Sequence, residues 1–340
     1  MSGNEGDSGG GIATNNVSAT LTNIVVRDNL AKYYGGGIQA RFTNVTLSDS
    51  TVSNNSVGYG IYGFGGGIYA RGSNIDITNS TISGNSAYVR GGGVDIWSHN
   101  SFSSSLMLLK STVSGNLSKN GGGIHAMAYN STTSPSTISL SNSTISGNSA
   151  TDNGGGVYAN YSTVTSTNST ISGNRAGISG GGIYTSVSSY VYLNNSIVSG
   201  NRLAPGQVAG FEIHDSGLSS TFTTNDANLF GDNSKPNSYA FTGFSPGASD
   251  IDATSDKDNI PLSSILDSLG NNGGPTRTLG LKKDSPAIDA GNNGICPATD
   301  QRGELRDDGL CDIGAFEGFV NDGSCYVIRD TNSKTIVFCL

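Results

Sequence analysis

Charged residues make up only 13% of this 340-residue chain, Trp occurs once, and Cys and His occur four and three times. A disordered chain of low hydrophobicity usually carries a high net charge, so a low charge content with 34% hydrophobic residues argues against simple disorder. The chain has no run of about 20 apolar residues, which excludes an ordinary transmembrane helix. The net charge of −8 argues against nucleic acid or an anionic membrane as a partner.

Acidic residues and cysteines are unevenly placed along the chain. Most of the acidic residues and all of the cysteines follow residue 200. Met1 leads directly into a Gly-rich segment, without the basic region and apolar stretch of an export signal. No capping segment precedes the repeats, although solenoid proteins usually protect their first coil. We therefore expect two chemically different parts, in a chain that is a piece of a longer protein.

Two short motifs recur in step along the first 201 residues. A Gly-Gly-Gly-(Ile/Val) motif alternates with a motif close to Ser-Thr-Ile-Ser-Gly-Asn, at intervals of 26 to 33 residues. The first motif begins at Gly9, Gly35, Gly65, Gly91, Gly121, Gly154 and Gly180. The second ends at Asn29, Asn55, Asn85, Asn116, Asn148, Asn174 and Asn201. Two motifs that hold phase over seven units indicate a structural repeat.

Each unit has the composition of short strands and turns. Apolar and polar residues alternate in short runs, as in Asn74–Thr78 (NIDIT), which is the period of a strand. No unit contains a helical period, which argues against leucine-rich and βαβ solenoids. Three short strands per unit would fit, each pairing in parallel with the next unit about 4.8 Å away. The sequence therefore predicts an all-β parallel β-helix.

The repeated positions can be assigned to the inside and to the turns of the coils. The position three residues after the first Gly of each triplet is always Ile or Val, from Ile12 to Ile183, and is predicted to point inward. The later strand supplies a second inward column: Val52, Ile82, Val113, Ile145 and Ile171. Glycine permits φ > 0 and close backbone approach at one corner. The recurrent Asn is predicted at the opposite turn, in a left-handed conformation and with its amide in a hydrogen-bonded ladder.

The alternation of GGGI/V with I/V-S-G/N-N resembles the GGA(I/L/V) and FxxN repeats of polymorphic outer-membrane proteins and related bacterial surface β-helices. Here Ile or Val stands in place of the Phe, and a third Gly in place of the Ala. The resemblance covers residues 9–201. It implies a right-handed, single-stranded, pectin-lyase-like β-helix that is secreted or lies on a bacterial cell surface, and it implies no particular ligand.

The regular repeats fade after Asn201, and residues 202–259 are predicted to form irregular coils and loops. The segments DSPAIDAG, DQRG and CDIGAFE within residues 260–318 resemble the choice-of-anchor Q region of bacterial surface β-helix proteins. That resemblance implies an exported protein and is silent on chemistry. The predicted domains are regular coils at 1–201, irregular coils at 202–259, an anchor-like region at 260–318 and a tail at 319–340.

The tail has the pattern of a β-hairpin. Two β-rich runs, Cys325–Arg329 and Lys334–Cys339, flank the turn sequence DTNS. An even number of cysteines in a secreted chain favours disulfides over metal ligation, since no Cys-x-x-Cys spacing occurs. Four cysteines allow three pairings. The preferred one joins Cys325 to Cys339 across the hairpin and Cys296 to Cys311 within an irregular, disulfide-containing C-terminal region.

The strand after each Gly triplet also defines outward positions. Four and six residues after the first Gly, these positions hold aromatic, Arg, Asp and His residues. Because sugars stack on aromatic rings while Arg and carboxylates bind hydroxyl and acidic groups, this face is a candidate for binding a glycan. The candidate residues are Tyr69, Arg71, Asp95, Trp97, His125, Tyr158 and Tyr184. The alternative is an ordinary exposed sheet face, on which Asp95 and His125 form a weak surface pair.

The supply of carboxylates argues against an enzyme on this face. A glycosidase needs paired carboxylates about 5–10 Å apart, and a lyase of the pectate type would need clustered acids for Ca²⁺ beside an Arg base. Only Asp95 of the four acids between residues 35 and 200 falls on the face; the others are Asp49, Asp76 and Asp152. No catalytic residue is therefore predicted, and a polysaccharide-cleaving protein stays the alternative.

Two further patterns have competing interpretations. Oxygen ligands at alternating spacing suit a structural Ca²⁺, and they come from Asp250, Asp252, Asp256 and Asp258. The segment lacks the central Gly and distal Glu of an EF-hand loop, so an exposed acidic loop is the preferred interpretation. A Thr column would give a hydroxylated face of the kind that binds ice, but its repeat is uneven, which argues against ice binding; it comprises Thr51, Thr81, Thr112, Thr144 and Thr170.

These patterns favour a non-enzymatic structural or adhesive stalk, outside the cell or on a bacterial cell surface. A stiff β-helix would present ladders of side chains to glycans, to cell-surface components or to copies of itself. One alternative is a polysaccharide-binding or polysaccharide-cleaving protein that uses the face from Tyr69 to His125. Another is a self-assembling extracellular filament, because an open solenoid end can pair with another.

Overall fold

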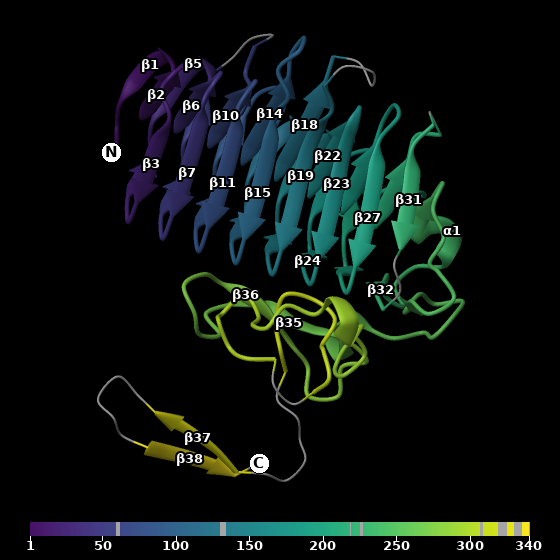
Figure 1. The fold of residues 1–340 in the computed structure, drawn as a ribbon. Helices are drawn as coiled ribbons and strands as arrows, with labels where there is room; N and C mark the ends of the chain where they lie inside the picture. The colour runs from purple at the N-terminus through teal and green to yellow at the C-terminus, as the bar shows by residue number, and fades with distance from the viewer. Residues whose placement is uncertain are drawn as a thin grey trace.

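The chain forms a parallel β-helix whose coils stack along one axis in a computed structural model (Figure 1). The structure describes residues 1–58, 62–129, 134–217, 219–224, 227–306 and 309–318, and the backbone of 325–329 and 335–339. Four parallel sheets run along the stack, so the predicted all-β solenoid is confirmed. In the described part, helix is limited to α1 (Asn237–Ala240) and the 3₁₀ turns η1 (Leu262–Ser264) and η2 (Asn293–Ile295).

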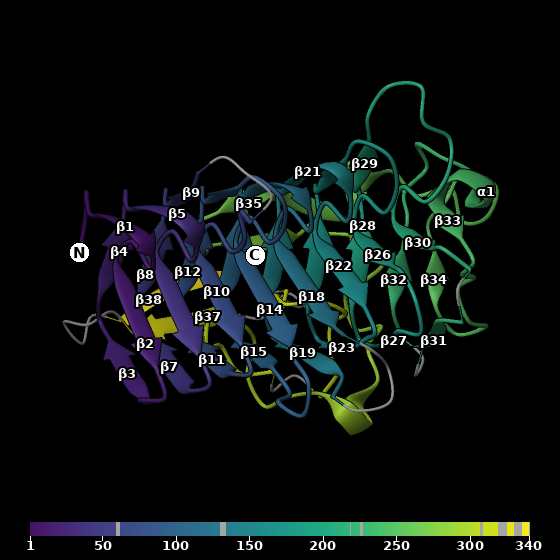
Figure 2. The same ribbon diagram turned by 90° about the horizontal axis from the view of Figure 1, so that it is seen from above.

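Each coil gives one strand to each of four sheets, here numbered I to IV in chain order (Figure 2). Sheet I contains β1 (Glu5–Ser8), β5 (Leu30–Tyr34), β9 (Ser56–Val57), β13 (Ser86–Ala87), β17 (Leu117–Asn120), β21 (Ser149–Asn153), β25 (Arg175–Ala176) and β29 (Arg202–Leu203). Sheet II contains β2 (Ile12–Asn15), β6 (Ile38–Arg41), β10 (Ile68–Arg71), β14 (Val94–Ser98), β18 (Ile124–Ala128), β22 (Val157–Asn160), β26 (Ile183–Thr185), β30 (Ile213–Asp215) and β33 (Phe241–Thr242).

Sheets III and IV complete each coil. Sheet III contains β3 (Ala19–Thr22), β7 (Asn44–Ser48), β11 (Asn74–Thr78), β15 (Ser105–Leu109), β19 (Ser136–Ser141), β23 (Ser162–Thr167), β27 (Tyr190–Asn194) and β31 (Thr221–Thr224). Sheet IV contains β4 (Val25–Arg27), β8 (Thr51–Ser53), β12 (Thr81–Ser83), β16 (Thr112–Ser114), β20 (Thr144–Ser146), β24 (Thr170–Ser172), β28 (Ile197–Ser199), β32 (Leu229–Phe230) and β34 (Ile251–Asp252).

The number of strands per coil differs from the prediction of three. The fourth strand is that of sheet I, which follows the recurrent Asn directly and is only two residues long in β9, β13, β25 and β29. Two residues are too few to show the alternation by which a strand is recognised in a sequence. Strands also continue beyond residue 201, since β30 to β34 extend sheets II, III and IV through residues 202–259.

The predicted inward columns form the core of the coils. In sheet II, Ile68 is the register partner of Ile38 on one side and of Val94 on the other, and all three side chains are buried. The second column, with Val52, Ile82 and Val113 among its members, joins the same hydrophobic cluster. Stacked aliphatic side chains therefore hold successive coils together, at about 1.5–3 kcal/mol for each fully buried side chain.

The Gly triplet is required because three different constraints meet at one corner. In the third of these triplets, Gly65 has φ +68°, which L side chains rarely adopt. A Cβ on Gly66 would lie 2.5 Å from the carbonyl oxygen of Gly92 in the next coil. A Cβ on Gly67 would lie 2.6 Å from the carbonyl oxygen of Gly93. One Gly therefore makes the turn, and the other two let the coils approach.

The recurrent Asn residues form the predicted ladder, but they are not left-handed. The backbone N–H and Nδ2 of Asn85 both donate to Oδ1 of Asn116, over 2.9 and 3.0 Å. The same pattern links all seven residues from Asn29 to Asn201. The positive φ belongs to the residue before each Asn, as at Gly84 and Gly115. Because the preceding residue makes the turn, the Asn side chain can point inward, where its amide joins the ladder.

Residues 260–318 lie along the outside of sheet IV (Figure 1). This segment contains the antiparallel pair β35 (Leu266–Gly270) and β36 (Thr278–Leu281). Thr112 Oγ1 donates to the carbonyl oxygen of Arg277 over 2.6 Å, and Thr144 Oγ1 donates to Oε1 of Gln301 over 2.6 Å. The segment is therefore anchored by hydroxyl groups of the Thr column.

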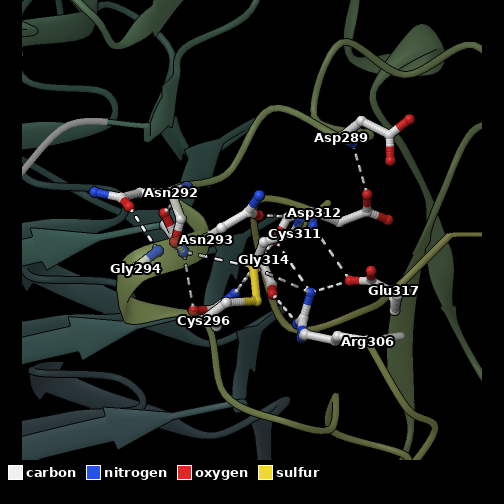
Figure 3. Close-up of a disulfide and its surroundings, with 12 residues drawn as sticks. Asp289, Asn292, Asn293, Gly294, Cys296, Arg306, Cys311, Asp312, Gly314 and Glu317 are labelled. Carbon is white, nitrogen blue, oxygen red and sulfur yellow. Dashed lines mark hydrogen bonds and ion pairs between the residues drawn. A yellow bond between two sulfur atoms is a disulfide. The ribbon is translucent and has the colours of Figure 1, made fainter. Parts of the chain in front are cut away.

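The preferred Cys296–Cys311 disulfide is present and closes an irregular loop (Figure 3). Asn293 Oδ1 accepts a hydrogen bond from the backbone N–H of Cys311 at 2.8 Å. Beside the disulfide, the Arg306 guanidinium forms an ion pair with Glu317 and donates to the carbonyl oxygen of Gly314. The loop is thus held by one covalent link and a small polar network.

The predicted hairpin is confirmed in backbone outline. Strands β37 (Cys325–Arg329) and β38 (Thr335–Cys339) are antiparallel, and Cys325 and Cys339 are register partners at the open end. The predicted disulfide between these two residues concerns side chains that lie outside the described part of the chain.

Candidate functional site

The outer face of sheet II carries the predicted ligand residues in two columns. In the first column Tyr69, Asp95 and His125 are register partners in successive strands, followed by Tyr158 and Tyr184. In the second column Arg71 is the register partner of Trp97. The fold therefore brings all seven predicted residues onto one face.

Three of these residues are buried rather than exposed. The exposed fraction is 2% for Tyr69, 0% for Asp95 and 4% for His125, while Tyr158 and Tyr184 are half-buried. The expected exposed Asp–His pair is therefore wrong. The reason is the tight corner at the Gly triplet, where a Cβ on Gly65 would lie 2.7 Å from the Cβ of Tyr69. The backbone at the triplet therefore packs closely against the residue of the first column in the same coil.

In three successive coils the residue just before the triplet supplies the cover. The ring of Tyr34 lies 4.9 Å from that of Tyr69, and Phe64 lies 6.5 Å from it. One coil further on, Arg90 takes this place and its guanidinium lies 4.0 Å over the Phe64 ring. These residues were not predicted, although a large side chain precedes the triplet in three successive units, which is the signal that could have identified them.

Asp95 is held between two cationic or potentially cationic groups. Its Oδ2 accepts from Nε of Arg90 at 3.0 Å, and its Oδ1 pairs with Nδ1 of His125 at 2.8 Å. Burial lowers the pKa of His125 below its ordinary value, and the hydrogen bond to Asp95 only partly offsets this. His125 is then neutral near pH 7, with Nδ1–H donating to the carboxylate. Arg90, Asp95 and His125, here called the buried triad, thus form one hydrogen-bonded group at sheet II of the β-helix.

Four rings stack in continuation of this unit along the first column. The ring centroids of His125 and Tyr158 are 4.8 Å apart, those of Tyr158 and Tyr184 4.9 Å, and those of Tyr184 and His214 5.3 Å. Burial raises the pKa of both Tyr158 and Tyr184 and lowers that of His214. The stack is thus uncharged near neutral pH and stiffens this face.

Residues of the second column and of the adjoining connections form a cluster of Arg and aromatic side chains. This arginine–aromatic cluster consists of Arg41, Phe42, Arg71, Trp97 and Phe102. The guanidinium of Arg71 lies 4.8 Å over the Trp97 ring and 5.9 Å from the Phe42 ring. The rings of Phe42 and Phe102 are 5.0 Å apart, edge to face. Phe42, Phe102 and Gly72 line a shallow cleft of about 310 Å³. Phe42 and Phe102 were not predicted, because they lie in turns outside the repeated strand positions.

The predicted calcium ligands are not gathered into a site. In the described part of the chain, no group of three or more His, Cys, Asp or Glu side chains is placed to hold a metal ion. Instead Asp250 accepts from Nδ2 of Asn228 at 3.0 Å, and Asp252 accepts from Nδ2 of Asn237 at 2.7 Å. Asp256 caps the backbone N–H of Asn237. Asp252 ends strand β34, and Asp250, Asp256 and Asp258 lie in the bends and turns on either side of it.

The Thr column is not a free surface along its length. Thr112, Thr144 and Thr170 are buried beneath residues 260–318, and only Thr51 and Thr81 are partly exposed. The second half of the column therefore does not form the open hydroxylated face that ice binding would require, an interpretation that the uneven repeat already disfavours. The hydroxyl groups are used to fix the C-terminal segment.

Comparison with known proteins gives one family. Residues 142–160 and 168–186 match the model of the Chlamydia polymorphic membrane protein repeat. Each match runs from the end of a sheet III strand, across the ladder Asn and the Gly triplet, into sheet II. The chain is thus a parallel β-helix in which two segments are similar to this repeat. Neither the curated proteins nor the solved structures contain a match to it, and the anchor-like resemblance of residues 260–318 stays a prediction.

No helix in the described part of the chain is both long enough and apolar enough to span a bilayer.

Proposed function

We propose that this protein is a non-enzymatic surface β-helix that acts as an adhesive stalk on the outside of a bacterial cell. The proposal is supported by the two matches to a polymorphic membrane protein repeat and by the continuous stack of coils. Stacked aliphatic columns and the Asn ladder make the rod stiff, since each coil is bonded to both neighbours. A stiff rod of this kind presents its outer side-chain ladders at fixed spacing to glycans or neighbouring proteins.

One observation carries the non-enzymatic part of the proposal. From β2 to β26, Asp95 is the only carboxylate in the two outward columns of sheet II. It is fully buried and is paired with both Arg90 and His125. A general acid or a nucleophile must reach its substrate, and a glycosidase needs a second carboxylate about 5–10 Å away. Neither condition is met on this face.

The experiment combines a binding screen with a test for cleavage. The purified chain is incubated with a panel of acidic and neutral polysaccharides, and products are followed by reducing-end release and by ultraviolet absorbance of unsaturated uronates. We expect binding to some members without product formation. Product that forms with wild type and disappears in Asp95→Ala or Arg71→Ala would overturn the proposal.

A further inference from the structure

We propose that the arginine–aromatic cluster binds the carboxylate groups of an acidic polysaccharide. This inference rests on the proposed surface function and names the class of ligand for the outer face of sheet II.

Two arginines of the cluster lie side by side without a counter-charge. Arg41 and Arg71 are register partners in adjacent parallel strands, and each is half-buried. Within the described residues no carboxylate lies within 4.0 Å of either guanidinium, and the Nε atoms of both are buried without a hydrogen-bond partner. Like charges directly opposite each other destabilise a sheet. A bound anion would relieve this repulsion.

The neighbouring rings indicate what kind of anion fits. Trp97 packs beneath the Arg71 guanidinium, and Phe42 and Phe102 stand beside it above Gly72. Aromatic faces accept the apolar C–H face of a sugar ring, whereas a small inorganic anion would make no use of them. The planar guanidinium fork matches a carboxylate in two parallel hydrogen bonds. Rings and forks together suit a uronic-acid residue.

The arginine–aromatic cluster contacts the buried triad through Arg90. The Arg90 guanidinium lies 5.2 Å from the Trp97 ring and is fixed by Asp95. Since Asp95 neutralises Arg90, the uncompensated charge of the face is that of Arg41 and Arg71. The net charge of −8 weakens long-range attraction of polyanions such as nucleic acid, so recognition has to depend on these local contacts.

The chain offers a matched control pair. Arg175 and Arg202 are also register partners, in sheet I, and both are exposed. Neither of them stacks on an aromatic ring among the described residues. General attraction of a polyanion to paired arginines would depend on both pairs equally, whereas a built site depends on the first alone.

The experiment uses the single Trp of the chain, which lies in the cluster, as the reporter. Wild type is titrated with an oligogalacturonate, with the same oligomer fully methyl-esterified, and with polyglutamate, and Trp97 fluorescence is followed together with calorimetry. We expect a saturable fluorescence change with the oligogalacturonate alone. Arg41→Gln/Arg71→Gln should weaken binding at least tenfold, the corresponding Lys variant less, and Arg175→Gln/Arg202→Gln less than twofold. Circular dichroism and thermal melting establish that the variants are folded.

The outcomes separate this inference from the function it rests on. Equal binding of the esterified oligomer or of polyglutamate overturns the assignment to an acidic polysaccharide, as does equal loss in both arginine pairs. Absence of any fluorescence or calorimetric response overturns it as well. None of these results touches the stalk proposal, which fails only when the chain cleaves its ligand.

Discussion

Asn201 donates both its backbone N–H and its Nδ2 to the carboxylate of Glu212, the latter over 2.6 Å. Glu212 thereby ends the Asn ladder. It lies opposite Gly182 of the preceding coil, and so occupies the position that the third Gly of a triplet holds in that coil. Each Asn of the ladder donates to the next coil and needs only an acceptor there. A carboxylate only accepts, so it can close the row.

Glu212 should make the stability of the rod depend on pH. Burial, with a smaller contribution from Asp232, raises the pKa of Glu212 well above its ordinary value. The protonated form is therefore favoured in the folded state, and its stabilising contribution is present at low pH and lost as pH rises through the raised pKa. Relative to Glu212→Gln, which does not ionise, wild type should lose melting temperature as the pH rises above the ordinary Glu pKa of about 4.5.

The control for this prediction is an exposed acid. Glu212→Gln is compared with Asp28→Asn, because Asp28 is about half exposed and pairs with Arg27 at only 3.7 Å. The Asp28 variant should follow wild type across the pH range. If the difference between wild type and Glu212→Gln stays constant with pH, the raised pKa is wrong.

Removing a rung from the middle of the ladder should be costly. Asn116 is fully buried, donates to the carbonyl oxygen of Ile82 and to Asn148, and accepts two bonds from Asn85. Asn116→Ala leaves several of these buried groups unpaired, at about 1–3 kcal/mol each, so we expect a loss of at least about 3 kcal/mol in the free energy of unfolding. Urea denaturation monitored by circular dichroism measures it.

Asn74→Ala is the matched control for this substitution. Asn74 also belongs to an Asn pair across coils, because its Nδ2 donates to Oδ1 of Asn44 at 3.1 Å, but that pair is exposed. Water replaces the lost bond, and the change should stay within about 0.5 kcal/mol. Equal effects of the two substitutions would show that burial of the ladder is not what matters.

Breaking the buried triad should destabilise the face that supports Trp97. Asp95→Asn removes the charge that faces Arg90 while keeping the shape of the side chain. Removal of one partner of a buried ion pair commonly costs about 3–5 kcal/mol. We expect a loss of this size in urea denaturation, together with a shift in Trp97 fluorescence as Arg90 moves. An Asp95→Asn protein with wild-type stability and spectrum would contradict the role given to the triad.

The repeat itself made the coils predictable, whereas packing between side chains far apart did not. Ile68 and Ile82 could be placed inward because their positions recur in every unit. The burial of Asp95 depends instead on Arg90, whose position is Tyr or Phe in the units before. A large side chain recurs before three triplets, but its chemistry changes from coil to coil, so the pattern does not specify which group it covers. The environment of Asp95 follows from contacts that only the three-dimensional fold defines.

The docking of residues 260–318 onto sheet IV depends on contacts between residues far apart in the sequence. Thr144 and Gln301 are 157 residues apart, and nothing in the spacing of either segment indicates that they meet. Gln301 is fully buried at this interface, where its Nε2 donates to Oγ1 of Thr112 at 2.9 Å and of Thr276 at 2.8 Å. One side chain thus joins two coils to the segment that covers them.

Gln301→Ala should therefore loosen the C-terminal segment and leave the coils intact. The substitution leaves the buried Thr144 hydroxyl without its acceptor, and an unpaired group of this kind costs about 1–3 kcal/mol. It also removes the amide that donates to Thr112 and Thr276, whose hydroxyls keep their bonds to the carbonyl oxygens of Arg277 and Lys110. Hydrogen exchange should accelerate in residues 276–302 and stay unchanged in β10 and β11. Lys282→Ala, which removes an exposed ion pair with Asp267, serves as the control and should alter neither region. Faster exchange throughout the rod would instead mean that the segment and the coils unfold as one unit.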